Sequence, residues 1–449
     1  MHLRHSSNDW VLLQGKRTRL TPLGMATFNR YIRRHANAVL LYSDHKVSVP
    51  GHSHTLLKPA WSLDLVRASG YPGEVLAIRA DALAHALHGQ PASGIYELML
   101  YLATRYRNEQ FVHIPQVLWH TSTSCREFRQ RELNPHILEQ HLRHMRVEAQ
   151  LSCDDHHYLH VHPTLPASPP RVSIIIPTRN MLHYLEPCID SILANATYPD
   201  VEIIVVDNQS DDPATLRYLD KIACNSYVKV LRYPHPFNYS AINNFAAEHA
   251  TGKILCLLNN DTAVITTDWL ERLVAQLLQP GVGVVGAKLL YANHTVQHAG
   301  DAVGVAGCAA HMHVGLEADA PGYMGRAILT QDVSAVTGAC LLTHTALYRQ
   351  LGGLNAKHLA VAFNDVDYCL RVREAQYKVM MVPHARLYHY ESVSRGGAKT
   401  PEKKQRMKQE LNYMHQRWQH QLKQDPFYHP HMNKRLADFT PASRFWPWN

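Results

Sequence analysis

The sequence predicts an α/β fold built on a mostly parallel β-sheet with helices on both faces. Two β-branched apolar runs, residues 172–177 and 201–207, flank a helical stretch at 182–194. This alternation of strand and helix favours parallel pairing. A third apolar run, 254–258, has the length of a buried strand and ends abruptly in Asn259-Asn260-Asp261. We therefore expect three strands whose polar ends meet at one edge of the sheet.

The composition is that of a globular protein with room for two or three domains. The chain has 449 residues, of which 46% are hydrophobic and 18% charged, and these values exclude a disordered protein. The net charge of +8, with 32 histidines, favours anionic partners such as nucleotide-sugars, phospholipid headgroups or acidic glycans. No nucleic-acid-binding motif accompanies the charge, so we expect no nucleic-acid partner.

The sequence shows no sign of export or of a membrane span. Its first residues lack the apolar core of a signal peptide, and no stretch approaches the roughly 20 apolar residues that cross a bilayer. The eight cysteines contain no CxxC pair. Cys256, Cys340 and Cys369 lie in apolar runs, where a buried free thiol is favoured. We expect a reduced, cytoplasmic protein.

Shifts in composition divide the chain into four parts. Residues 1–124 alternate short apolar runs with turns, and residues 125–170 form a helical and then Pro-rich linker. Residues 171–400 contain the alternating strands and helices. Residues 401–449 begin with a charged helix and end in an aromatic segment with Phe445, Trp446 and Trp448. We expect this tail either to wrap over the preceding domain or to contact a membrane or a partner.

Polar side chains follow each of the three predicted strands. They are Pro177 and Thr178, then Asp207 and Asn208, then Asn259, Asn260 and Asp261. An Asp at a strand end can accept hydrogen bonds from a nucleobase or ribose, and Asp261 beside Asn carbonyls suits a hard divalent cation. Taken alone, each strand end is better explained by a helix cap or an Asx turn. Three such ends in one alternating domain favour ligand binding.

Two later segments supply further candidates. Asp365 and Asp367 open a predicted helix, where the helix dipole favours charged carboxylates. A carboxylate there could take a proton from a sugar hydroxyl, and the alternative is a capping pair. His389 follows an apolar run. It is either a buried hydrogen-bonding residue or a ligand that completes a metal site with an Asp.

The order and spacing of these motifs resemble those of family 2 glycosyltransferases with the GT-A fold. In particular, the sequence is similar to bacterial enzymes that build O-antigen and other surface polysaccharides. The resemblance spans about residues 171–430. It rests on six motifs: Ile175-Ile176-Pro177-Thr178, Val206-Asp207-Asn208, Leu258-Asn259-Asn260-Asp261, Thr337-Gly338-Ala339-Cys340, Phe363-Asn364-Asp365-Val366-Asp367 and His389-Tyr390-Glu391-Ser392.

The resemblance implies a role for each candidate residue. Asp365 would be the catalytic base of an inverting transfer and Asp367 would orient the base or the acceptor. A Mn²⁺ or Mg²⁺ ion would be held by Asp261, Asn259 and His389, with Asp261 as the main ligand because Asn259 replaces the first Asp of the family's metal motif. The metal would stabilise the departing diphosphate. The donor would be bound by Pro177, Thr178, Asp207, Asn208, Asn259 and Asn260.

The implied partners are a UDP- or dTDP-sugar donor and a glycan or lipid-linked glycan acceptor. The basic, aromatic tail is expected to approach the inner face of the cell membrane. Galactose, glucose, rhamnose and N-acetylhexosamine donors all fit the resemblance. The alternative is a non-catalytic glycan-binding or scaffold pseudo-glycosyltransferase. A processive synthase is disfavoured, because its Gln-x-x-Arg-Trp segment has Met414 before Arg417-Trp418 here.

Residues 1–124 resemble the second half of the same domain, as a truncated, degenerate copy. Residues 10–16 fall where 255–261 fall in the later copy, and Lys16, beside Arg17, takes the place of the metal carboxylate. Ile95 replaces the catalytic base. Three further segments correspond: 40–44 with 289–291, 95–100 with 365–370, and 114–120 with 382–389. We expect no sugar transfer by this part, which is either a remnant or a scaffold or acceptor-binding unit.

Overall fold

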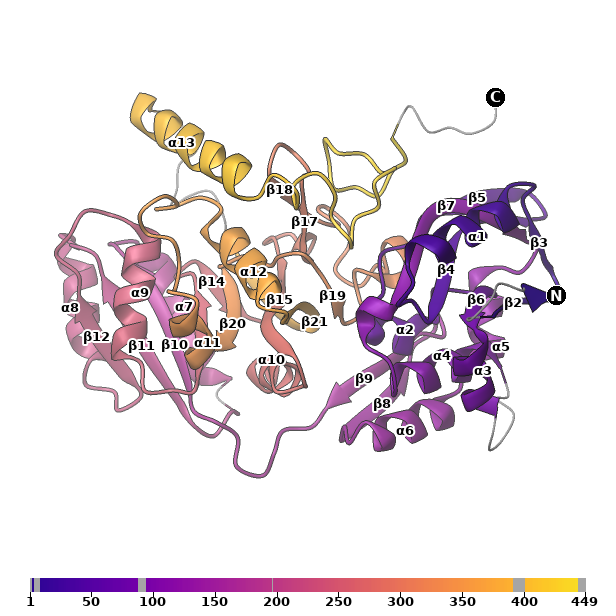
Figure 1. The fold of residues 1–449 in the computed structure, drawn as a ribbon. Coiled ribbons are helices and arrows are strands. Elements are labelled where there is room, and N and C mark those ends of the chain that lie inside the picture. Colours follow the sequence, from indigo (N-terminus) through magenta and orange to yellow (C-terminus); the bar gives the residue numbers. More distant parts are fainter. Residues whose placement is uncertain (1, 4–8, 88–93, 196, 391–399, 443–449) are drawn as a thin grey trace.

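The structure is a computed structural model that describes residues 2–3, 9–87, 94–195, 197–390 and 400–442. Figure 1 shows two parts, a smaller N-terminal sheet in indigo and purple and a larger sheet in magenta to orange. The yellow C-terminal segment lies above the region between them. The aromatic residues of the tail, Phe445, Trp446 and Trp448, lie outside the described residues, as do Glu391 and Ser392 of the last motif.

The larger sheet has ten strands and carries the predicted motifs. Its strand order is β12-β11-β10-β13-β20-β15-β21-β14. The bounds are β10 (Val172–Thr178), β11 (Val201–Asp207), β12 (Val228–Arg232), β13 (Ile254–Leu258), β14 (Thr262–Val264), β15 (Val282–Leu290), β20 (Cys340–His344) and β21 (Lys378–His389). The first four strands are parallel, as the alternation of strands and helices predicts. The sheet as a whole is mixed, because β20 runs antiparallel to both of its neighbours.

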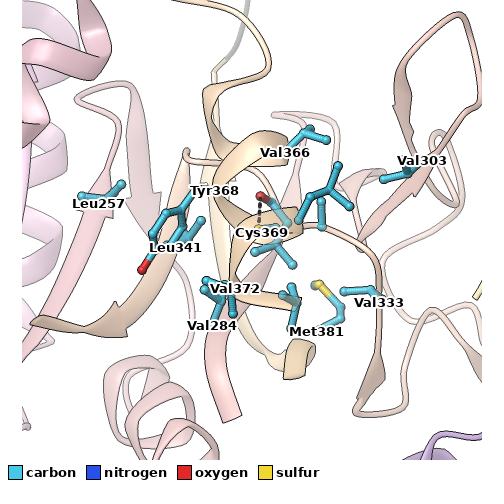
Figure 2. Close-up of a cluster of buried hydrophobic side chains, with 14 of the residues drawn as sticks. Leu257, Val284, Val303, Val333, Leu341, Val366, Tyr368, Cys369, Val372 and Met381 are labelled. Atoms are coloured by element: carbon cyan, nitrogen blue, oxygen red, sulfur yellow. Dashed lines mark hydrogen bonds between the residues drawn. The ribbon is translucent and has the colours of Figure 1, made fainter. Parts of the chain in front are cut away.

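Helices cover both faces of this sheet, so its central strands are apolar on both sides. In β13, Ile254, Cys256 and Leu258 pack on one face, and Leu255 and Leu257 on the other. The first face is covered by α7 (Leu182–Ala194), α8 (Pro213–Ile222) and α10 (Trp269–Leu277). The second is covered by α9 (Tyr239–His249), α11 (Thr345–Gln350) and α12 (Asn364–Glu374). Figure 2 shows the second face, where side chains of α12 pack against Leu257 and Leu341.

The N-terminal sheet repeats the second half of the larger sheet. Its order is β1-β2-β6-β4-β7-β3, with β5 paired to β4. Strands β2, β6, β4, β7 and β3 pair in the same directions as β13, β20, β15, β21 and β14. The bounds are β1 (His2–Leu3), β2 (Trp10–Gln14), β3 (Thr18–Leu20), β4 (Leu40–Val49), β5 (His52–Leu56), β6 (Val75–Arg79) and β7 (Phe111–Thr121). This geometry supports the interpretation of residues 1–124 as a second, partial copy.

The helices of the N-terminal part follow the same order. They are α1 (Gly24–Arg34), α2 (Leu63–Ser69), α3 (Ala80–Leu87) and α4 (Ile95–Ala103). In α4 the buried residues Tyr96, Leu98, Met99, Leu100 and Leu102 repeat the buried pattern of α12 at Val366, Tyr368, Cys369, Leu370 and Val372. The repeat therefore extends from strand order to the faces that the helices bury.

Strand pairing corrects three of the predicted correspondences between the copies. Trp10 pairs with Arg79 as Ile254 pairs with His344, so Arg17, not Lys16, stands at the position of Asp261. Thr121, not His120, corresponds to His389. Residue 40 corresponds to 284, not 289. Short apolar runs do not fix register by themselves, because several shifts keep the same pattern. Arg17 is also a cation, so the expectation of no metal site there is unchanged.

The linker contains more structure than its composition indicates. After α5 (Cys125–Glu132) and α6 (Pro135–His144), the polar His-rich stretch forms a hairpin of β8 (Ala149–Cys153) and β9 (Leu159–Pro163). The charged helix expected after residue 400 is α13 (Pro401–Arg417). None of the described helices is both long and apolar enough to cross a membrane.

The two sheets are joined by buried polar contacts. Ser62 Oγ donates to Asp332 Oδ2 at 2.6 Å, and the Leu57 N–H donates to the Tyr323 hydroxyl at 2.8 Å. His429, from the C-terminal segment, is 2.8 Å from Asp44 Oδ2 of the N-terminal sheet. These residues are widely separated in the chain, so the N-terminal part and the larger domain pack as neighbours with a specific interface.

Candidate active site

The polar ends of the first three strands meet at one edge of the larger sheet. Thr178 pairs with Asp207 across β10 and β11, and β13 lies on the other side of β10. Asn260 Nδ2 donates to Thr178 Oγ1 at 3.0 Å, and the Asn208 N–H donates to the Thr178 carbonyl at 2.8 Å. The structure therefore brings the predicted donor-binding residues together, because parallel strands share an edge.

Asp207 is held at this edge by two donors. Its carboxylate accepts from the Ser210 N–H at 3.1 Å and from the guanidinium of Arg232, which lies at the end of β12. Asn208 instead donates its side-chain amide to the carbonyls of Tyr233 and His235. The half-exposed Arg232, which the sequence analysis missed, therefore lies against Asp207 at this edge of the sheet. Asn208 mainly fixes the loop that follows β12.

The three predicted metal ligands form a second cluster on the same edge. Pairing of β14 with β21 places Thr262 opposite His389, and His389 Nε2 lies 3.3 Å from Asp261 Oδ1 and 3.3 Å from Asn259 Nδ2. Asp261 is 4% exposed and His389 is 7% exposed. Two ligand atoms that each bind a divalent cation at about 2.1 Å lie about this far apart. The carboxylate of Asp261 and the imidazole of His389 fit a divalent ion. The Asn259 atom that faces His389 is the amide nitrogen, which is not a metal ligand.

Asp365 lies at the start of α12, next to this cluster. Its two oxygens accept from the Gly338 and Val366 N–H groups, each at 2.8 Å. The preceding residue but one, Phe363, has a left-handed φ of 59°. A bulky residue in this conformation is strained, and such strain is concentrated where the surrounding structure fixes a functional geometry. The carboxylate keeps lone pairs for a further donor, since a carboxylate offers about four acceptor positions.

Asp367 has a different environment from Asp365. It is 1% exposed, and its oxygens accept from Arg371 Nε at 2.8 Å and from Trp418 Nε1 at 2.9 Å. Arg371 also donates to the carbonyls of Leu351 and Gly353. These bonds fix α12 against the segment after α13. The predicted role of Asp367 in orienting the base or the acceptor stays a prediction.

Tyr239 connects the metal cluster with the turn that holds Asp365. Its hydroxyl lies 3.2 Å from Asn259 Oδ1 and 3.0 Å from the Gly338 carbonyl. Gly338 is the residue whose N–H binds Asp365. The sequence analysis did not identify Tyr239, because a buried tyrosine at the start of a helix has the same pattern as an ordinary core residue.

Two other groups of metal-capable side chains occur among the described residues. One is Asp44 with His113 and His429, and the other is His298 with Asp301 and His311. Burial would raise the pKa of Asp44, but His113 and His429 hold that pKa well below its ordinary value. The His431 N–H donates to Nδ1 of His429, so Nε2 carries the proton and donates to Asp44. This first group is therefore satisfied by hydrogen bonds alone.

The equivalent edge of the N-terminal sheet carries different chemistry. An open groove of about 860 Å³ there is lined by Lys16, Arg17, Glu97 and Arg131, among others. By strand register Gly15 replaces Asn259 and Arg17 replaces Asp261. A cation at that position repels a metal ion, which agrees with the expectation that this part transfers no sugar.

Comparison with known proteins finds similarity to a glycosyltransferase family and to two bacterial proteins. Residues 173–352 match the family model Glycosyl transferase family 2. The protein y4gI of Sinorhizobium fredii, described as uncharacterized, is 36% identical over 445 residues, which are 95% of this chain and 49% of that protein. The O-antigen biosynthesis protein RfbC of Myxococcus xanthus is 32% identical over 444 residues, 96% of this chain and 34% of that protein. The chain thus spans half or less of the length of these relatives.

Solved structures also show a likeness. The mannosyltransferase PcManGT from Pyrobaculum calidifontis, in complex with GDP-Man and Mn²⁺, has a TM-score of 0.41 and 18% identity over 62% of this chain and 71% of that chain. GalNAc-T7 with UDP, GalNAc and Mn²⁺ has a TM-score of 0.42 and 15% identity over 54% of this chain and 46% of that chain.

Proposed function

We propose that residues 173–352, which match the model Glycosyl transferase family 2, belong to a GT-A domain that transfers a sugar with inversion from a nucleotide-diphosphate-sugar. The acceptor is a glycan or a lipid-linked glycan of a bacterial surface polysaccharide of O-antigen type. The observation that carries this proposal is the arrangement around Tyr239, which holds the Asp261–His389 cluster and the turn of Asp365 next to each other.

The donor occupies the edge formed by β10, β11 and β13. Asp207 accepts hydrogen bonds from the base or ribose, with Pro177 and Thr178 beside it. A UDP- or dTDP-sugar presents an imide donor that suits this carboxylate. Asp261 and His389 would hold the cation, and Asn259 would join them through Oδ1, which lies 3.2 Å from the Tyr239 hydroxyl. A bound Mn²⁺ or Mg²⁺ would supply the positive charge that stabilises the diphosphate leaving group.

Asp365 is the catalytic base. The Gly338 and Val366 N–H groups orient its carboxylate, and the N-terminus of α12 favours the charged form. It takes the proton from the acceptor hydroxyl as that oxygen attacks the anomeric carbon. Asp367 acts as a positioning residue, because its oxygens hold Arg371 and Trp418 rather than facing a substrate.

The biological setting follows from the relatives and from the charge. One relative is named as an O-antigen biosynthesis protein. The eight cysteines are all free, which agrees with a reducing compartment, and the net charge of +8 favours contact with anionic lipid headgroups. We place the protein in the cytoplasm at the inner face of the membrane, where lipid-linked glycans are extended.

The test of the donor site is thermal unfolding of the intact chain with UDP and dTDP, with and without Mn²⁺. A ligand that binds only the folded state adds about 2.7 kcal/mol at a hundredfold excess over Kd. We expect a Mn²⁺-dependent rise in Tm with one of the two nucleotides, and its loss in Asp261→Ala.

His311→Ala is the matched control, because it removes one member of the second metal-capable group and leaves Asp261 in place. It should keep the nucleotide response. The absence of any nucleotide response in the wild-type chain would contradict the proposal and favour the non-catalytic scaffold. If His311→Ala lost the response and Asp261→Ala kept it, the ion would bind at the group of His298, Asp301 and His311 and not at Asp261.

A further inference from the structure

Gln297 makes two contacts with one residue of the candidate metal cluster. It lies in β16 (Val296–His298), is 1% exposed, and contacts both the backbone and the ring of His389. Its Nε2 donates to the His389 carbonyl at 3.2 Å, and its Oε1 lies 2.6 Å from His389 Nδ1.

These two contacts define how the glutamine amide is oriented. A backbone carbonyl can only accept a hydrogen bond, so the NH₂ group of Gln297 must face the His389 carbonyl. The amide oxygen therefore faces the imidazole. An amide oxygen is also only an acceptor, so Nδ1 of His389 must carry the proton. The reversed amide would place oxygen against oxygen at the carbonyl.

The consequence lies at the other ring nitrogen. A neutral imidazole has one N–H, so Nε2 of His389 carries a lone pair. This lone pair faces Asp261 Oδ1 at 3.3 Å and accepts a hydrogen bond from Asn259 Nδ2 at 3.3 Å, which an ion at Nε2 would replace. A lone pair beside a carboxylate oxygen is the arrangement that binds a cation.

We propose that Gln297 is a positioning residue that holds His389 in the Nδ1–H tautomer, with the Nε2 lone pair ready to bind the divalent ion. The inference rests on the proposed function, since it names how one ligand of that site is prepared. The glutamine does this without adding a negative charge beside Asp261. The partner that orients a ligating histidine typically contributes 10- to 100-fold, at order of magnitude, to metal affinity.

The test compares Gln297→Met, which removes both polar contacts, with Gln297→Glu, which keeps an acceptor at Nδ1 but loses the donor to the His389 carbonyl. Gln276→Met is the matched control, because Gln276 is also buried but lies on α10 and contacts Met380. The first readout is the tautomer of His389 in the metal-free protein, from ¹⁵N-histidine NMR at mildly alkaline pH. The signal is assigned by its loss in His389→Gln. The second is the Kd for Mn²⁺ alone, from titration calorimetry.

We expect the Nδ1–H tautomer in the wild-type chain, in Gln297→Glu and in Gln276→Met, and its loss in Gln297→Met. The Kd for Mn²⁺ should rise about 10- to 100-fold in Gln297→Met and stay within about threefold in the control. An unchanged tautomer together with an unchanged Kd in Gln297→Met would overturn the inference. A wild-type chain that binds no Mn²⁺ but shows the tautomer change in Gln297→Met would refute the metal site while supporting the role of Gln297.

Discussion

Buried neutral histidines are the residue-scale feature that most affects how this protein responds to pH. Among the 32 histidines of the chain, burial and then Arg67 lower the pKa of His141 to about 3. Burial followed by Lys58 holds the pKa of His45 well below its ordinary value. Burial followed by Arg326 and Lys288 does the same for His313. Each of these side chains stays neutral in the folded protein but takes up a proton in mild acid in the unfolded chain.

This predicts loss of stability in mild acid. The folded pKa of such a histidine lies below its unfolded value of about 6.5, so between the two values the unfolded chain binds more protons. The free energy of unfolding therefore falls as the pH falls below about 6.5, by roughly 1.4 kcal/mol per pH unit for each histidine. Urea unfolding across this range should show the fall.

His141→Gln isolates one contribution to this slope. Gln keeps an acceptor for Arg67, which now donates to His141 Nε2 at 3.1 Å. The pH slope of the free energy of unfolding should be lower by one proton in this variant. Equal slopes in the wild type and His141→Gln would show that His141 is not held neutral.

At the residue scale, the sequence predicted the candidate metal ligands and the candidate base better than the residues that hold them in place. Asp261, His389 and Asp365 stand out because a polar side chain after an apolar run is visible in the sequence. Tyr239 and Gln297 act through contacts between segments 20 to 99 residues apart, and no local pattern reports such contacts. The distinction between Asp365 and Asp367 also depends on Trp418, which lies 51 residues away.

At the scale of elements, α12 is held in place by hydrogen bonds of several of its polar side chains. Its start carries Asp365, and two residues later Asp367 binds Trp418, which follows α13. Trp418 is fully buried, and Arg371 adds bonds to the carbonyls of Leu351 and Gly353. The helix that positions the base is therefore held by a polar network rather than by apolar packing alone.

Trp418→Phe should destabilise the protein by about 1–3 kcal/mol, because it leaves an oxygen of the buried Asp367 carboxylate without its donor. Urea unfolding measures the change. Arg143→Gln is the control, since Arg143 forms an exposed pair with Glu139 that contributes about 0–1 kcal/mol. If Trp418→Phe cost no more than Arg143→Gln, the network would not be what holds α12.

Elements with strong local patterns were predicted well, and elements defined by distant pairing were not. The helix at Leu182–Ala194 begins and ends as expected. The hairpin of β8 and β9 was missed because its strands are short and polar. The antiparallel β20 could not be foreseen, since a strand's direction depends on the long segment that precedes it and not on its own residues.

At the scale of the whole molecule, one arrangement of strands occurs twice with different chemistry. The sheet around β4 and β7 repeats the pairing around β15 and β21. The later copy has Asp261 and His389 at its edge, and the earlier one has Arg17 and Thr121 there. We propose that the N-terminal part serves as a docked scaffold, held through Asp44, His429 and Ser62.

The repeat was visible in the sequence, but its register was not. Apolar runs such as 10–13 and 254–258 match at several offsets, and only the strand pairing selects one. The domain boundaries at 124, 170 and 400 stay a prediction, as do the donor sugar and the acceptor.

The measurement that tests the central claim most directly follows the anomeric sugar released by the intact chain from a UDP- or dTDP-sugar in Mn²⁺. NMR reports the configuration of the first product formed on transfer to water. We expect the anomer opposite to that of the donor, and a rate lower by about 10²–10⁴ in Asp365→Asn with the Mn²⁺-dependent nucleotide response unchanged. A product with the donor's own configuration, or full activity in Asp365→Asn, would contradict inverting transfer with Asp365 as the base.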